Sequence, residues 1–170
     1  MLCHGFQGNS FDMRLIKNNL YLLYPDALFL SSKANEEYTN GNIADMGRRL
    51  AQEVNVFLKE WCPGESLGRL SFIGHSLGGV IIRAALPNLS EYSDRMYLFM
   101  SLSSPHLGYM YNNSKLIEAG IWFLRNTRKS ECLEELHMTD QEQLADCYLY
   151  KLTNNPGLGW FRNIALLCSY

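Results

Sequence analysis

The sequence predicts an α/β fold, with a mostly parallel sheet covered by helices on both faces. Short apolar segments alternate with longer segments whose apolar residues recur at helical spacing. The short segments carry almost no polar residues, which is typical of parallel strands that are buried on both faces. Strand–helix alternation of this kind makes the strands parallel. The 170 residues are enough for one domain with a sizeable core.

The amino-terminal part of the chain shows the alternation first. An apolar segment, Met1–Cys3, is followed by a loop and then by a helix that Asn9 or Ser10 can cap. This helix ends near Pro25, and Ala27–Leu30 is predicted to be a short buried strand. We therefore expect two strands joined by one helix.

A long amphipathic helix occupies the next segment. Asn42 caps this helix and Pro63 ends it. Its apolar side consists of Ile43, Met46, Leu50, Val54, Phe57, Leu58 and Trp61. Leu70–Ile73 is the strand that follows, and the next helix begins at Leu77 and continues until Pro87.

The carboxy-terminal part contains two further predicted strands, separated by a long interval. Met96–Leu102 and Ile164–Cys168 are nearly all apolar, so we expect both to be buried on both faces. The interval between them is predicted to be helical at Lys115–Arg125 and at Gln141–Leu152.

Composition and charge exclude several classes of protein. Hydrophobic residues make up 47% and charged residues 19% of the chain, as in an ordinary folded domain. The net charge of −2 gives no reason to expect a nucleic-acid partner. No apolar run reaches the roughly 18 residues of a transmembrane helix. The five cysteines lack paired spacing, so we expect reduced, mostly buried thiols, a cytoplasmic location and no metal or organic cofactor.

The segment Gly74-His75-Ser76-Leu77-Gly78 matches the G-x-S-x-G pattern of a nucleophile elbow. The pattern alone would occur by chance in roughly 5% of chains of this length, but here a strand precedes it and a helix follows. The turn is tight, so glycine is needed on either side and the serine adopts a strained backbone conformation. The Ser76 hydroxyl would then lie at the carboxyl edge of the sheet, beside a helix N-terminus that favours negative charge.

Two alternatives to a nucleophile apply to this segment. It could be a glycine-rich turn without chemistry, or a loop that binds phosphate. The Walker and Rossmann patterns of phosphate-binding loops are both absent. We therefore predict that Ser76 is a nucleophile and that His75 points away from the pocket.

A second motif, His4-Gly5-Phe6, lies one strand–helix repeat ahead of the elbow. In hydrolases with such an elbow, the residue after the nucleophile supplies one oxyanion-hole N–H, and a loop after an earlier strand supplies the other. The donors here would be the backbone N–H groups of Leu77 and Phe6. His4 is expected to be structural or to lie at the rim of the site, without an acid–base role.

Three segments carry a resemblance to a known family: HGFQGNSFDMRL, LSFIGHSLGGVIIRAAL and SLSSPHLGYMYNNS. Together they resemble the lipase-like serine esterase family of eukaryotes, in particular the carboxy-terminal domain of long proteins named only as a family with sequence similarity. HGF with GHSLGG is also similar to neutral lipases, whose oxyanion hole uses the positions of Phe6 and Leu77. The resemblance covers nearly the whole chain. It implies an α/β-hydrolase fold and hydrolysis of carboxylic esters.

The catalytic triad expected in such a fold is incomplete here. Its members follow one another in the order Ser, Asp or Glu, His. The resemblance implies that the acid lies just beyond Tyr170, that the His lies further on, and that two strands precede Met1. We therefore expect residues 1–170 to be a partial domain, truncated at both ends.

His106 is the strongest candidate for a base within the chain, because it follows the strand after the nucleophile helix. We consider three roles for it, namely general base, rim or structural residue, and substrate contact, and we favour the second. No internal acid is convincing. Asp94 precedes its strand, and Asp140 and Asp146 lie in the long interval.

Residues 109 to about 160 lie where α/β-hydrolases carry a helical cap-like insertion. Its large apolar residues include Tyr109, Met110, Tyr111, Ile117, Ile121, Trp122, Phe123 and Leu124. They could line an acyl-chain tunnel or touch a lipid surface, but we favour the buried face of an ordinary crossover helix.

These observations predict a serine esterase or lipase that cleaves acyl esters through an acyl-enzyme on Ser76. The expected partner is a small-molecule or lipid ester, with transient contact to a membrane surface; oligomeric state is not indicated. One alternative is a hydrolase fold that has lost catalysis and serves as an interaction module, since no base and acid are visible. Another is acyl transfer or thioester hydrolysis on the same machinery, which the fold does not distinguish.

Overall fold

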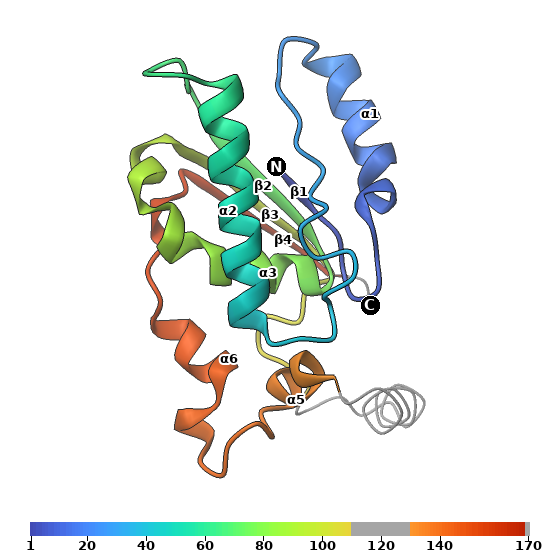
Figure 1. Ribbon diagram of the computed structural model, residues 1–170, viewed down its shortest axis with the longest axis vertical. Helices are drawn as coiled ribbons and strands as arrows, with labels where there is room; N and C mark the ends of the chain where they lie inside the picture. Colours follow the sequence, from blue (N-terminus) through green and yellow to red (C-terminus); the bar gives the residue numbers. More distant parts are fainter. Residues whose placement is uncertain (110–129, 169–170) are drawn as a thin grey trace.

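A four-stranded parallel sheet forms the centre of the structure, a computed structural model that describes residues 1–109 and 130–168 (Figure 1). The strands lie side by side in the order β1 (Leu2–Cys3), β2 (Leu70–His75), β3 (Met96–Leu102) and β4 (Asn163–Leu167). Each strand pairs in parallel with the next. All four strands therefore end at one edge of the sheet, where the loops that follow them meet.

Helices α2 (Ile43–Trp61) and α3 (Leu77–Ala85) cover one face of the sheet and lie in front of it in Figure 1. The main apolar cluster joins these helices to Phe72 of β2 and Phe99 of β3, both fully buried. Full burial of a side chain of this size contributes about 1.5–3 kcal/mol to stability. This layer fixes α3, and with it the connection between β2 and α3.

Helix α2 has the bounds that the sequence predicts. The Asn42 side chain accepts a hydrogen bond from the Asp45 backbone N–H at 2.8 Å, which caps the helix. The buried residues of the helix are Ile43, Met46, Gly47, Leu50, Ala51, Val54 and Leu58. Trp61, which we placed on the same apolar side, is instead 56% exposed, and it is the last residue of the helix.

The opposite face of the sheet is covered by α1 (Arg14–Leu23), which continues a 3-10 turn, η1 (Ser10–Met13). Asn9 caps this turn in a capping box with Asp12, as predicted for Asn9. A small apolar cluster of Leu2, Met13 and Ile73 lies beneath α1. Helices therefore lie on both faces of the sheet, as expected.

The predicted strand Ala27–Leu30 is wrong. Leu28 is 50% exposed, and this part of the chain contributes only an isolated parallel bridge between Leu2 and Ser31. The Ser32 N–H donates to the Leu2 carbonyl at 2.8 Å. Because β1 is two residues long, it can pair with no more than this short piece of backbone.

The prediction that β4 is buried on both faces is also wrong. Ile164 and Leu166 are 49% and 59% exposed. Strand β4 lies at the edge of the described sheet, and α1 packs over Leu2 and Ile73 near the other edge. Strand β3, for which we made the same prediction, is only partly buried, since Met96, Phe99 and Ser101 are buried and its other residues are half-buried.

The insertion contains short helical pieces in its described part. The predicted continuous helix Gln141–Leu152 is wrong, because Cys147 has an extended backbone (φ −59°, ψ 141°) that interrupts it. The Asp140 carboxylate accepts from the Tyr148 N–H at 2.9 Å and so starts a new turn. The pieces are α5 (Glu131–His137), η3 (Leu144–Asp146), α6 (Tyr148–Lys151), η4 (Leu152–Asn154) and η5 (Leu158–Trp160). The predicted helix Lys115–Arg125 lies outside the described residues.

All five cysteines lie in the described part of the chain and are free thiols. Cys3, Cys132 and Cys147 are buried, as expected for small apolar residues, whereas Cys62 is half-buried and Cys168 is exposed. Within residues 1–109 and 130–168, no helix is both long enough and apolar enough to cross a bilayer.

Candidate active site

Ser76 alone connects β2 to α3, and its backbone is strained. Its dihedral angles are φ 51° and ψ −125°, a region that residues with a side chain rarely occupy. Such a conformation costs on the order of 1–3 kcal/mol and persists only where its surroundings enforce it. Here the Ser76 N–H donates to the Leu102 carbonyl at 2.8 Å, and the Gly79 N–H donates to the Ser76 carbonyl at 3.2 Å. The strained elbow predicted from the sequence is therefore present.

Two glycines allow the chain to turn this tightly. A Cβ atom on Gly74 would stand 2.5 Å from the backbone nitrogen of Gly79 in α3. A Cβ atom on Gly78 would stand 2.4 Å from the carbonyl oxygen of Cys3 in β1. Both obstacles are backbone atoms, so neither can move aside cheaply. The elbow is thus in close contact with α3 on one side and with the end of β1 on the other.

The loop after β1 packs against the elbow. Gly5 is buried, and a Cβ atom on it would stand 2.9 Å from the Cβ of Ser76. The loop is closed by a hydrogen bond from the Gly8 N–H to the Gly5 carbonyl at 3.1 Å. The Gln7 N–H, from a residue with φ 52°, donates to the Thr39 hydroxyl at 2.9 Å. The structure therefore brings the two sequence motifs together.

His4 is buried in this loop, with 1% of its surface exposed. Its Nδ1 lies 3.0 Å from the Gly5 carbonyl oxygen, which can only accept, so Nδ1 carries the proton. Its Nε2 is buried and has no hydrogen-bond partner among the described residues. These contacts fit the structural role expected for His4. His75, the residue before the nucleophile candidate, is exposed.

The backbone N–H groups of Phe6 and Leu77 are the predicted oxyanion donors. Leu77 is the first residue of α3, where N–H groups have no partner within the helix. Among the described residues, neither N–H group donates a hydrogen bond to the protein. Both N–H groups are therefore without a protein acceptor in the described structure, and the N-terminus of α3 adds a partial positive charge next to Ser76.

His106 follows β3 but is directed toward that strand. Its Nε2 lies 2.9 Å from the Ser101 hydroxyl, which is buried in β3, and its ring packs against Phe99. Burial, and then the nearby Arg83, lower the pKa of His106 to about 4. A neutral imidazole engaged with Ser101 fits the structural role that we favoured over a general base.

The carboxylates of Asp140 and Asp146 interact with residues other than Ser76 and His106. Asp140 accepts from the Tyr148 backbone, and Asp146 forms an ion pair with Lys151 at 3.2 Å. In the described ranges, no cluster of three His, Cys, Asp or Glu side chains could hold a metal ion.

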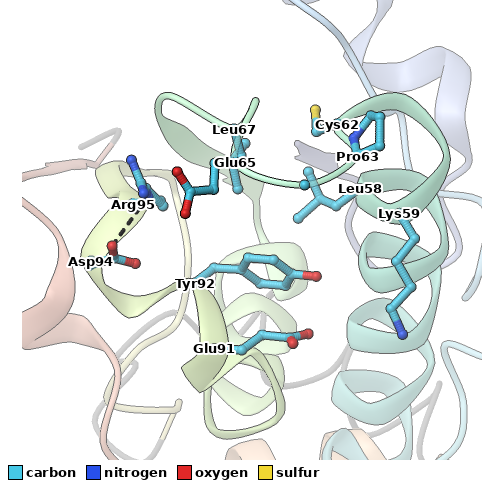
Figure 2. A pocket seen from close by; sticks show the side chains of 11 residues that line it. Leu58, Lys59, Cys62, Pro63, Glu65, Leu67, Glu91, Tyr92, Asp94 and Arg95 are labelled. Carbon is cyan, nitrogen blue, oxygen red and sulfur yellow. Dashed lines mark ion pairs between the residues drawn. The ribbon is translucent and has the colours of Figure 1, made fainter.

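Asp94 lies at the opposite edge of the sheet, beside a cavity of about 490 Å³ (Figure 2). It forms an ion pair with Arg95 at 3.2 Å, directly before β3 begins. Tyr92 extends toward Leu58 and the carboxyl end of α2 across this cavity. The cavity is therefore separate from the candidate active site.

Arg83 is a residue of interest that our sequence analysis missed. It is 8% exposed, and its guanidinium donates to the His106 carbonyl at 3.1 Å and to the Leu152 carbonyl at 3.4 Å. These contacts tie both ends of the insertion to α3. The available signal was a single charged residue within the otherwise apolar segment Leu77–Ala85.

A parallel sheet with helices on both faces, and a strained serine between a strand and a helix, define the α/β-hydrolase class. The fold agrees with the crystal structure of Bacillus licheniformis lipase BlEst2 in mature form, with a TM-score of 0.53 and 15% identity. That match covers 95% of this chain and 62% of the lipase. The propeptide form of the same lipase matches with a TM-score of 0.52 and 16% identity, over 95% of this chain and 34% of that one.

A match over almost the whole sequence shows which family the chain belongs to. Residues 1–169 match the family described as "Putative serine esterase (DUF676)", and the chain belongs to this family. It is also 29% identical, over 135 residues, to the protein of Saccharomyces cerevisiae described as "Putative lipase ROG1". That alignment covers 72% of this chain and 19% of the yeast protein, so the chain spans a small part of its relative.

Proposed function

We propose that this chain is the nucleophile-bearing part of a serine esterase that cleaves carboxylic esters through an acyl-enzyme on Ser76. The observation that carries the proposal is the backbone conformation of Ser76. Its φ of 51° is strained because serine, unlike glycine, has a side chain. Strain of this kind is retained where it serves a function. Membership of a serine esterase family supports the same chemistry.

In the proposed mechanism, Ser76 Oγ attacks the ester carbonyl carbon while a general base takes its proton. The carbonyl oxygen becomes an oxyanion that accepts hydrogen bonds from the N–H groups of Phe6 and Leu77. The oxyanion collapses, the alcohol leaves with the proton held by the base, and the acyl group stays on Ser76. Water then repeats the sequence and releases the carboxylic acid. Each oxyanion donor typically contributes about 2.7–4 kcal/mol to transition-state stabilisation.

The base and its orienting acid are proposed to come from outside the described residues. His106 is held by Ser101, and the carboxylates of Asp140 and Asp146 are engaged in the insertion. We propose that residues outside the described ranges supply a carboxylate and a histidine that approach Ser76 at the carboxyl edge of the sheet.

The proposed substrates are esters with an apolar acyl chain. Leu107, in the loop after β3, is 80% exposed at the same edge of the sheet as Ser76. Phe6 and Tyr109 are half-buried apolar groups on neighbouring loops. These side chains, with the described part of the insertion, residues 130–160, would bind the acyl chain, and the description of the yeast relative as a putative lipase supports this choice.

Labelling with a fluorophosphonate tests the proposal. The full-length protein should be labelled, and Ser76→Ala should abolish the labelling, because only an activated serine reacts with this probe. Ser66→Ala, at an exposed loop serine, is the matched control and should be labelled like the wild type. Absence of labelling in a protein with a cooperative unfolding transition would contradict the proposal and favour a non-catalytic interaction module.

A further inference from the structure

A second cavity, of about 470 Å³, lies beside the carboxyl end of α3. Its wall is formed by Arg83 and Leu86 from the region of α3 and by residues 152, 153 and 155–160 of the chain that returns to β4. Phe6, Ser76 and Leu77 do not line it. Its volume lies within the range of roughly 300–1,000 Å³ that small-molecule sites occupy.

The cavity has a buried cation in its wall. Arg83 is 8% exposed, and it forms no ion pair with a carboxylate of the described residues. Its two hydrogen bonds, to the carbonyl oxygens of His106 and Leu152, use two of the five N–H donors of a guanidinium. A buried charge without an opposite charge is unfavourable, so the remaining donors favour an anion in the cavity.

The rest of the wall is apolar at Leu86, Leu152, Pro156, Leu158 and Trp160 and polar at Thr153 and Asn155. Leu86 and Leu152 are almost completely buried, and Leu158 and Trp160 are half-buried against the core. No lysine or second arginine lines the cavity. One guanidinium suits the two oxygens of a single carboxylate, whereas a phosphate site usually gathers several donors or cations.

We propose that this cavity binds an amphiphile with one carboxylate, such as a medium-chain fatty acid. The carboxylate pairs with the free donors of Arg83, and the alkyl chain lies against Pro156, Leu158 and Trp160. This site is distinct from the ester site at Ser76 and does not depend on Ser76 being a nucleophile. Because Arg83 also holds His106 and Leu152, an occupied cavity would fasten both ends of the insertion to α3.

Calorimetric titration of the full-length protein with decanoate tests the proposal. Decanoate should bind at least tenfold more tightly than decan-1-ol, which lacks the charge, and more tightly than inorganic phosphate, which lacks the chain. Arg83→Met keeps the apolar stem and should weaken decanoate binding at least tenfold. Equal affinity for decanoate and decan-1-ol would overturn the proposal, as would stronger binding of phosphate.

A second variant removes the cavity without touching Arg83. Gly159 lines the cavity, and a Cβ atom on it would meet nothing within 4 Å, so Gly159→Leu adds apolar volume at the cavity wall with no clash at its Cβ. Gly68 has the same open surroundings and does not line this cavity, so Gly68→Leu is the matched control. Gly159→Leu should weaken decanoate binding at least tenfold, and Gly68→Leu should not change it. Decanoate that binds Gly159→Leu as tightly as the wild type occupies another place, and the proposal is then wrong, even if Arg83→Met fails to fold.

Discussion

Gly5 and Ser76 approach each other so closely that a Cβ atom on Gly5 would stand 2.9 Å from the Cβ of Ser76. The same atom would stand 3.1 Å from the His75 carbonyl oxygen. The loop that carries the proposed donor Phe6 is thus positioned by direct contact with the proposed nucleophile. The separation between donor and nucleophile depends on the absence of a side chain at Gly5.

Gly5→Ala should therefore impair hydrolysis more than folding. The added methyl group would push the loop away from Ser76, and a displacement of about 1 Å can lower kcat by about 10²-fold. We expect a loss of stability of about 1–3 kcal/mol, as for other overpacked sites. Steady-state hydrolysis of p-nitrophenyl butyrate and urea unfolding measure the two effects. Gly68→Ala is the control, and equal activity of both variants would contradict the proposed contact.

Ser76→Gly should be more stable than Ser76→Ala. Glycine adopts φ 51° without the clash that a Cβ atom causes, whereas alanine retains it. We expect a difference of about 1–3 kcal/mol in the free energy of unfolding, measured by urea denaturation at pH 7. Two inactive variants of equal stability would show that the elbow is not strained.

His106→Gln should remain active. The glutamine amide can still hydrogen-bond to the Ser101 hydroxyl, and the proposed base lies elsewhere. We expect kcat within about tenfold of the wild type, because loss of a general base lowers rates by about 10²–10⁴-fold. Since the pKa of His106 is lowered to about 4, its titration should not appear in the pH–rate profile near neutrality. A loss of about 10³-fold in kcat, without unfolding, would instead make His106 the base.

Glu135 should make the stability of the protein depend on pH. This buried residue of α5 accepts a hydrogen bond from the Ile43 N–H, at the start of α2, at 2.7 Å. Burial, and then the charges of Asp140, Glu131 and Asp45, raise its pKa from 4.5 to about 7, against the effect of that hydrogen bond. The folded protein therefore holds this proton more tightly than the unfolded chain does. The stabilisation is fully present below about pH 4.5 and is lost as the pH rises through about 7.

Glu135→Gln tests this dependence, because glutamine keeps the acceptor for Ile43 and cannot ionise. The variant should be more stable than the wild type at pH 8, by up to about 3 kcal/mol, and the two should converge near pH 4.5. Glu142→Gln, at an exposed position, is the control. Parallel stability curves for wild type and Glu135→Gln between pH 4.5 and pH 8 would contradict the raised pKa.

The sequence was most reliable for elements whose structure is determined by their own residues. Helix α2 carries its cap at Asn42 and a continuous apolar face, so its bounds followed from local pattern alone. The elbow was predictable because Gly74 and Gly78 flank a serine at the point where a predicted strand passes into a predicted helix. The structure adds the reason for Gly78, which is the approach of β1 rather than a collision within the turn.

Other features depend on packing between distant residues and could not be predicted locally. Ile164 and Leu166 are as apolar as a buried strand, yet they lie at the edge of the described sheet. The break at Cys147 arises because the Asp140 side chain binds the Tyr148 N–H. Arg83 acquires its role only when His106 and Leu152 are brought to α3 by the fold.

Trapping of the acyl-enzyme tests the central proposal most directly. The full-length protein is mixed rapidly with p-nitrophenyl butyrate, quenched in acid and digested, and the peptide that contains Ser76 is analysed by mass spectrometry. We predict a burst of p-nitrophenol and a butyryl group on Ser76, both absent from Ser76→Ala. Turnover of the ester without acylation of Ser76, or with acylation at another residue, would contradict the assignment of Ser76 as the nucleophile.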